Sequence, residues 1–260
     1  MSRELTIVCW KWKPEPGSKH PAKRAGFSSE HVNRLYNMLS RFLSRPFELV
    51  CVTDDWKGLD SAVRAININR HFALYAEMGG CYRRLRAFDL SVAVVLFGKR
   101  FVSIDLDVVI TGGLDDLLEW EDFRIWQDTY RRFCPYCGSL FAMRAGARQW
   151  LWDFWQEDPI RAARVANEVD RYVGTDQAYI SSCLYPGAEV WTSEDGLYNF
   201  NTQVRRCAAG VVRRRGKFTE IPGRDGTLPD GAKLVFFNGK YDPSQPELQA
   251  QYEWIGDLWR

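Results

Sequence analysis

The stretch RFVSIDLDVVI, residues 100–110, has the composition of a buried β-strand but carries two aspartates. Apolar residues flank Asp105 and Asp107, and a buried carboxylate is costly unless something pairs with it. Residues two apart in an extended strand point the same way, so we expect the two carboxylates to share a face. Like charges this close raise each other's pKa unless a cation lies with them. The stretch therefore indicates a site for Mg²⁺ or Mn²⁺, which accept carboxylate and phosphate oxygens as ligands.

The alternative is an amphipathic strand whose acids face solvent. A D-x-D pattern is common and does not decide between the two alone. The runs VSI before the pair and VVI after it favour a strand that is covered on both faces. Such strands are typical of a mainly parallel sheet between two layers of helices.

The rest of the chain alternates in the same way, with strands separated by helical segments. This alternation predicts an α/β fold with a mainly parallel sheet flanked by helices, in one domain. Strands are expected at 4–10, 47–55, 65–69, 100–110, 123–128, 138–146 and 232–239. One helix is expected from Ser28 or Ser29 to Phe42, and a second, short helix just before the third strand. Further helices are expected at 79–88, 149–155 and 176–184.

Composition sets the class of protein. The chain has 260 residues, 46% of them hydrophobic and 11 of them Trp, which predicts a folded protein with a sizeable core. Seven scattered cysteines do not form a secreted disulfide framework. No stretch approaches the roughly 20 apolar residues of a membrane span, and no signal-peptide pattern begins the chain. These features predict a cytoplasmic protein, and the net charge of +2 identifies no class of partner.

Polar residues follow several of the expected strands. Lys11 follows the first, Asp54 the second, Asp105 and Asp107 lie in the fourth, and Asn238 ends the last. Ligands of open α/β sheets bind at the carboxyl ends of the strands. We therefore expect these residues to border one site.

Six short segments occur in an order that resembles GT-A glycosyltransferases, particularly the glycogenin-like family 8 and related bacterial and phage proteins. CYRRL (81–85) resembles the family's Y-x-R-L segment, and RFVSIDLDVVITGGLDDLL (100–118) resembles its metal-binding strand. IWQD (125–128), CGSLFAMRAG (137–146), GTDQAYIS (174–181) and VFFNGK (235–240) resemble later segments. The resemblance spans about residues 4–241. It implies a Rossmann-like GT-A domain over 1–260, with a nucleotide-binding half at about 1–110 and an acceptor-binding half at about 111–260.

The resemblance implies a metal, Mn²⁺ or Mg²⁺, and a nucleotide-sugar donor, for which we expect UDP. Asp105, Asp107 and Asn238 would hold the metal. Asp176 would serve as nucleophile or as stabiliser of an oxocarbenium-like transition state, with retention of anomeric configuration. Taken alone, TDQ is better explained as an ordinary helix start. The expected catalytic residues are Asp176, Gln177 and Asp128. The expected donor-binding residues are Cys9, Trp10, Lys11, Thr53, Asp54, Arg84, Asp105, Gly239 and Lys240.

The sequence departs from the family's pattern at two positions. Asn238 stands where related proteins usually carry a metal-binding histidine, and Cys137 stands where they carry an asparagine near the sugar. An asparagine oxygen can bind Mg²⁺ or Mn²⁺, but it is a harder ligand than imidazole. These departures leave the identity of the sugar open. They also motivate an alternative, a nucleotide-sugar or carbohydrate-binding protein with impaired catalysis.

A basic segment, QVRRCAAGVVRRRGK (203–217), suggests the kind of acceptor. Its six cations in a short span favour an anionic partner, although a solvated loop explains any single one of them. A glycan, a lipid-linked sugar and DNA with a hydroxylated base all qualify. The expected acceptor-binding residues are Arg205, Arg206, Arg213 and Arg214. A nucleic-acid-binding module without catalysis is a third hypothesis, which rests on these arginines alone.

Overall fold

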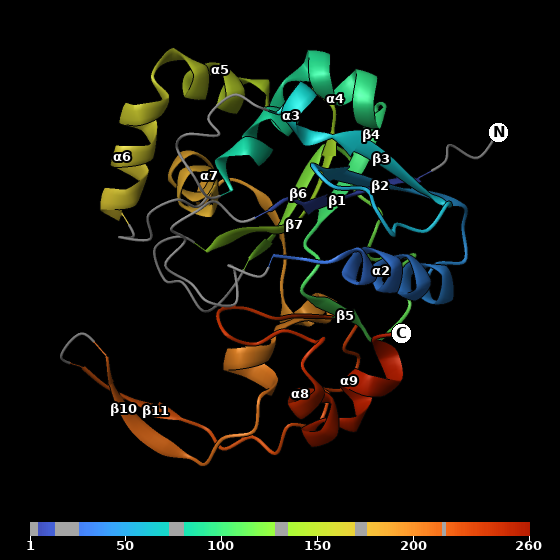
Figure 1. Ribbon diagram of the computed structural model, residues 1–260. Coiled ribbons are helices and arrows are strands. Elements are labelled where there is room, and N and C mark those ends of the chain that lie inside the picture. Colours follow the sequence, from blue (N-terminus) through green and yellow to red (C-terminus); the bar gives the residue numbers. More distant parts are fainter. Residues whose placement is uncertain (1–4, 14–25, 73–80, 128–134, 170–175, 215–216) are drawn as a thin grey trace.

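The computed structural model describes residues 5–13, 26–72, 81–127, 135–169, 176–214 and 217–260. A seven-stranded sheet with the order β3-β2-β1-β4-β7-β6-β8 forms its centre (Figure 1). Its strands are β1 (Leu5–Lys11), β2 (Phe47–Thr53), β3 (Val63–Asn67), β4 (Arg100–Ile104), β6 (Phe123–Gln127), β7 (Tyr136–Arg144) and β8 (Glu189–Trp191).

The sheet is mostly parallel, as the sequence predicts. β1 pairs in parallel with β2 and β4, β2 with β3, and β6 with β8, whereas β7 runs antiparallel to both of its neighbours. The chain builds β1, β2 and β3 outward in one direction and then returns to place β4 on the other side of β1. This reversal is a topological switch point, where open α/β sheets bind ligands.

Each face of the sheet has its own core, because successive residues of a strand point to opposite faces. Ile7 and Cys9 belong to one core, together with Leu35 of α2. Val8 and Trp10 belong to the other, beneath the helices on the far side (Figure 1). The helical elements are α2 (Ser29–Phe42), α3 (Ile68–His71), η2 (Tyr82–Phe88), α4 (Leu90–Phe97), α5 (Gln149–Glu157), α6 (Pro159–Val169) and α7 (Asp176–Leu184), then η3 (Ser193–Asp195), η4 (Phe200–Val204), α8 (Pro246–Gln251) and α9 (Glu253–Leu258).

The stretch at 100–110 is not one strand, which corrects the expectation of a continuous extended segment. It divides into β4 and β5 (Val108–Ile110), and the two halves join different sheets. β4 pairs with β1 and β7, whereas β5 pairs with β12 (Leu234–Phe236), which also pairs with β9 (Leu197–Asn199). Asp105 and Asp107 therefore lie in the link between the two sheets, on either side of the buried Leu106.

Two smaller differences concern the third and last strands. Residues 54–62 form turns where a short helix was expected, and the helix α3 comes after β3 instead. The strand ends at Asn67 because the side chain of this residue caps α3, accepting hydrogen bonds from Asn69 and Arg70. The last strand of the prediction shortens to β12. Within the described residues, no helix is both long and apolar enough to cross a bilayer.

A two-stranded hairpin projects from the body of the molecule (Figure 1). It consists of β10 (Gly210–Arg214) and β11 (Lys217–Ile221), which pair antiparallel. An isolated bridge between Cys207 and Arg224 closes its base. The hairpin contains most of the basic segment that the sequence singles out.

Candidate active site

The candidate site lies where β1, β2 and β4 end and β7 begins. In the parallel part of the sheet these carboxyl ends meet at one edge, and the antiparallel β7 brings its first residues there. The backbone NH of Asp105 donates to the carbonyl of Ser139 at 2.8 Å, which ties the end of β4 to β7. The site therefore occupies the switch point of the sheet.

Arg84 joins two of the predicted acids across the site. Its Nε and Nη2 donate to the two carboxylate oxygens of Asp176, at 2.8 and 2.9 Å. Its Nη1 donates to Oδ1 of Asp105. The three side chains come from η2, the start of α7 and the end of β4. Only the tertiary structure brings them together.

This network is buried to different degrees along its length. Arg84 is 6% exposed and Asp176 2%, whereas the side chain of Asp105 is 21% exposed. Burial alone would lower the pKa of Arg84, but the neighbouring carboxylates of Asp105 and Asp176 hold that pKa well above its usual value. The guanidinium therefore stays charged. One cation between two anions leaves the network with a net negative charge.

A glycine and a serine of β7 complete the network, and the sequence analysis assigned a role to neither. A Cβ on Gly138 would lie 3.0 Å from Oδ2 of Asp176 and 3.1 Å from Nη2 of Arg84, so only glycine fits here without displacement. The Ser139 hydroxyl donates to Oδ2 of Asp105 at 2.6 Å, and the Cys137 thiol lies 3.2 Å from Ser139 Oγ. The resemblance of the segment CGS (137–139) to the family pattern is the sequence signal for this part of the site. The contacts of Gly138 and Ser139 could not be predicted from it, because their partners are far away in the chain.

Asp107 and Asn238 lie on neighbouring chain segments. The backbone NH of Phe237 donates to the carbonyl of Asp107 at 2.7 Å, which extends the antiparallel pairing of β12 with β5 by one residue. Asn238 is the next residue after Phe237. Asn238 thus comes beside the link that carries both aspartates. Gly239 follows with φ of +68°, and Lys240 is exposed with its Nζ 5.3 Å from the centre of the Tyr241 ring.

The donor set of these residues suits a hard divalent cation. Two carboxylates and a neutral amide offer oxygen ligands only, and the Arg84 network next to them has a net negative charge. Among the described residues, no group of three or more His, Cys, Asp or Glu side chains gathers as a metal site. Any metal here would depend on the amide and on ligands from a substrate.

The residues predicted from the ends of β1 and β2 are more buried than expected. Cys9 and Trp10 are packed in the two cores, and Trp10 Nε1 donates to Ser103 Oγ at 2.8 Å. Lys11 is also buried, and its Nζ donates to the carbonyl of Asp55. Thr53 Oγ1 donates to the same carbonyl at 2.9 Å. The side chains at these strand ends thus hold the adjoining loops in place.

Asp54 is partly exposed at this end of the sheet. Its carboxylate accepts from the backbone NH of Lys13 at 3.1 and 3.2 Å, which joins the loops after β1 and β2. Gln177, next to Asp176, is buried at the start of α7, and its backbone NH donates to Oδ1 of Asp176 at 3.0 Å. The remaining predicted catalytic residue, Asp128, lies outside the described residues.

Arg205 and Arg206, near the start of the basic segment, have partners outside the Arg84 network. Arg205 Nε donates to Asn201 at 3.1 Å and its guanidinium covers the Tyr241 ring at 5.4 Å. Arg206 Nε donates to the carbonyl of Asp225 at 2.7 Å. Arg213 and Arg214 belong to β10. A cavity of ≈ 530 Å³ near the base of the hairpin is lined by Gln203, Val204, Gly223, Arg224, Asp225, Thr227 and Pro229.

No protein-family model matches the sequence, and neither does any curated protein. Solved glycosyltransferase structures nevertheless share its fold. A structure of the galactosyltransferase LgtC with donor and acceptor sugar analogs has 11% identity and a TM-score of 0.56, with 98% of this chain and 96% of LgtC covered. GlyE of Streptococcus pneumoniae has 11% identity and a TM-score of 0.58, with 98% of this chain and 62% of GlyE covered. The bifunctional glycosyltransferase WbbM has 12% identity and a TM-score of 0.55, with 99% of this chain and 50% of WbbM covered. The chain thus has the GT-A-like fold of these glycosyltransferases.

Proposed function

We propose that this protein is a metal-dependent glycosyltransferase that moves a sugar from a nucleotide-sugar donor, with UDP as the nucleotide, to a hydroxyl acceptor. The observation that carries the proposal is the buried contact of Arg84 with both Asp105 and Asp176 at the switch point of a GT-A-like sheet. A fold alone does not establish an activity, so the argument rests on this site.

The divalent cation would be held by Asp105, Asp107 and Asn238. When bound, Mn²⁺ or Mg²⁺ supplies positive charge that offsets the charge developing on a departing nucleotide diphosphate. The network orients the first of these ligands: Ser139 and Arg84 each donate to a different carboxylate oxygen of Asp105. Both oxygens keep further lone pairs for a metal.

The structure bears on the two roles considered for Asp176. Its Oδ2 accepts from Arg84, and its Oδ1 accepts from both Arg84 and the backbone NH of Gln177. A carboxylate held by three donors is a weakened nucleophile but remains a fixed negative charge. We therefore favour Asp176 as the group that stabilises an oxocarbenium-like transition state, with the sugar transferred with retention.

We propose an anionic acceptor, recognised through the basic segment at 205–217. A glycan, a lipid-linked sugar and modified DNA differ in size but share negative charge. Arg205 and Arg206 border the base of the hairpin, and β10 carries Arg213 and Arg214 outward. Contacts of this kind weaken with salt. Transfer to the correct acceptor should therefore decline between low and physiological ionic strength, whereas hydrolysis of the donor should not.

The experiment that tests the proposal is a thermal-shift screen followed by a donor-hydrolysis assay. UDP, GDP, CDP and their sugars are each added with and without Mn²⁺, and release of nucleoside diphosphate is then measured for any donor that raises the Tm. We expect stabilisation by UDP or UDP-sugars only when the metal is present, and slow hydrolysis of one donor. Full activity in EDTA would exclude the metal role.

A second candidate function is nucleotide-sugar binding without transfer. Cys137 and Asn238 favour it, because they replace residues that family 8 enzymes usually carry at the sugar and at the metal. Calorimetry distinguishes the two. Metal-dependent binding of UDP with no turnover of any sugar nucleotide would support the binding protein, whereas slow donor hydrolysis excludes it.

A further inference from the structure

Exposed apolar side chains concentrate on one side of the molecule. Ten large hydrophobic residues are exposed in the described part of the chain, and seven of them lie on α4, α5 and α6. These three helices cover the side of the central sheet away from α2 (Figure 1). The seven are Leu90, Val94, Val95, Trp150, Phe154, Ile160 and Val165. Such a concentration is typical of an interaction surface and not of a free monomer.

The helix α4 provides the clearest evidence. Its sequence LSVAVVLF contains one polar residue, Ser91, and a helix that is apolar on all sides is normally covered on all sides. Ala93 and Phe97 are buried against the protein. On the outer side, Leu90 is 46% exposed, Val94 43% and Val95 79%. The outer side of α4 is therefore as apolar as a buried face, but no described part of the chain covers it.

The first turn of α5 lies next to that of α4. The backbone NH of Leu90 donates to the Gln149 side chain at 2.6 Å. On α5, Trp150 and Phe154 are 38% and 57% exposed, and their rings meet edge to face with centroids 5.6 Å apart. We call Leu90, Val94, Val95, Trp150 and Phe154 the α4–α5 patch. Exposed aromatic rings at the centre of an apolar patch are typical anchors of protein interfaces.

Charges of both signs border the patch. Glu157 ends α5, and Arg161 and Arg164 follow on α6, all of them exposed. None of the three forms an ion pair with another described residue. An anionic membrane would select a basic border, and Glu157 with the adjacent Asp158 disfavours that. A border with one acidic and one basic portion is instead complementary to a rotated copy of itself.

We propose that the α4–α5 patch is a two-fold interface with a second copy of this chain, in which Glu157 of each copy faces the arginines of α6 of the other. An interface of this kind places the same surface on both partners, which a self-complementary border allows. The inference is independent of the proposed catalytic function. The helix η2, which contains Arg84, leads directly into α4, so the dimer would brace the element behind the site.

The first test measures oligomeric state by sedimentation equilibrium and light scattering over a range of concentrations. The wild-type chain is expected to have the mass of two chains at micromolar concentration. Val95→Lys would place an unpaired charge in the interface and should raise the dimer Kd about tenfold or more. Val211→Lys is the matched control, because Val211 is also exposed, at 61%, but lies on the hairpin. Cooperative thermal unfolding of each variant would show that both fold.

The second test exchanges the charges. Glu157→Arg and Arg161→Glu should each weaken the dimer, and the double variant should recover most of the wild-type Kd. Three results would overturn the proposal: a monomer at every concentration, a dimer that Val95→Lys leaves unchanged, or a monomer that sediments with phosphatidylglycerol vesicles. The last result would assign the patch to a membrane surface. If the double variant does not recover the wild-type Kd, then Glu157 does not face the arginines of α6 across the interface.

Discussion

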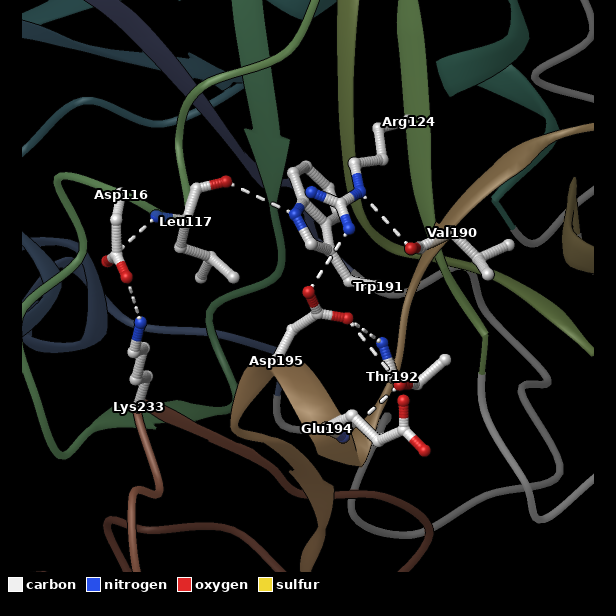
Figure 2. Close-up of polar contacts among 9 residues, drawn as sticks. All are labelled: Asp116, Leu117, Arg124, Val190, Trp191, Thr192, Glu194, Asp195 and Lys233. Carbon is white, nitrogen blue, oxygen red and sulfur yellow. Dashed lines mark hydrogen bonds and ion pairs between the residues drawn. The ribbon is translucent and has the colours of Figure 1, made fainter.

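Two arginines of this protein, Arg124 and Arg84, each connect elements that are distant in the sequence by contacts with aspartates, but the surroundings of the two differ. Arg124 of β6 donates to one aspartate, Asp195, at 3.1 Å and to the carbonyl of Val190 at 3.1 Å (Figure 2). Its guanidinium lies 5.3 Å from the centre of the Trp191 ring. Arg84 instead lies between two aspartates and is nearly inaccessible to solvent.

The difference lies in charge balance and burial. Asp195 also accepts from the backbone NH of Thr192 at 2.8 Å and closes a short capping box, so each group near Arg124 has a local structural use (Figure 2). The side chains of Arg124 and Asp195 are 21% and 30% exposed, where water screens the pair. The Arg84 network holds one more negative than positive charge, and its Asp176 end is almost wholly buried, which is costly unless a cation or ligand compensates that charge. We infer that Arg124 serves the fold and Arg84 serves a site.

The largest contrast should appear in catalysis. Asp105→Asn and Asp107→Asn are each expected to lower donor hydrolysis by about 10²–10³-fold or more, because the proposed metal would lose a charged ligand. Asp195→Asn is the matched control and should keep nearly full activity. Rates of nucleoside diphosphate release with Mn²⁺ would measure the effect. Full activity of Asp105→Asn would refute the proposed site.

Stability should distinguish the two arginines next. Arg84→Met leaves two carboxylates without their partner and is expected to lower the free energy of unfolding by about 3–5 kcal/mol. Arg124→Met should cost about 1 kcal/mol or less, because its pair is partly exposed. Urea unfolding measures both. Equal losses for the two variants would contradict the comparison.

The close approach of β7 to the network is tested by Gly138→Ala. The added Cβ would meet Asp176 and Arg84 at 3.0–3.1 Å, which should destabilise the protein by about 1–3 kcal/mol and disturb donor hydrolysis. Gly113→Ala is the control, because nothing lies within 4 Å of a Cβ there. Thermal unfolding and the hydrolysis assay provide the readouts. Indistinguishable behaviour of the two variants would show that the site tolerates displacement.

The smallest effect is expected at the structural pair itself. Asp195→Asn keeps an oxygen that can accept from Thr192 but loses the charge facing Arg124. We expect a loss of about 0.5 kcal/mol, declining with added salt. Urea unfolding at low and high ionic strength measures it. A loss of unfolding free energy as large as that of Arg84→Met would show that the Arg124–Asp195 pair is not a weak surface pair.

Much of the fold could be predicted from the sequence. The strand expected at 4–10 is present as β1, and its residues Ile7 and Cys9 enter one core while Val8 and Trp10 enter the other. The helix after Ser28 and the helix expected at 149–155, which is α5, are also present. Local sequence patterns suffice for β1, α2 and α5 because burial of apolar side chains sets the spacing of hydrophobic residues in a strand or helix.

The break at Asp105–Asp107 could not be predicted in the same way. VSI and VVI are equally suited to strands, and only the available partners decide that β4 pairs with β7 and β5 with β12. The side chains of Cys9 and Trp10, which the sequence analysis assigns to the donor site, lie in the two cores, and their role in donor binding stays a prediction.

The sequence by itself determined the α/β class, the faces of its main strands and the presence of two acids that require a partner. Only the tertiary structure decided which partner the first acid has within the chain. Arg84 and Asp176 are separated from Asp105 by 21 and 71 residues, and Ser139 reaches it from another strand, β7. Hydrophobic periodicity repeats within a few residues, whereas a charge network forms only when distant strand ends meet.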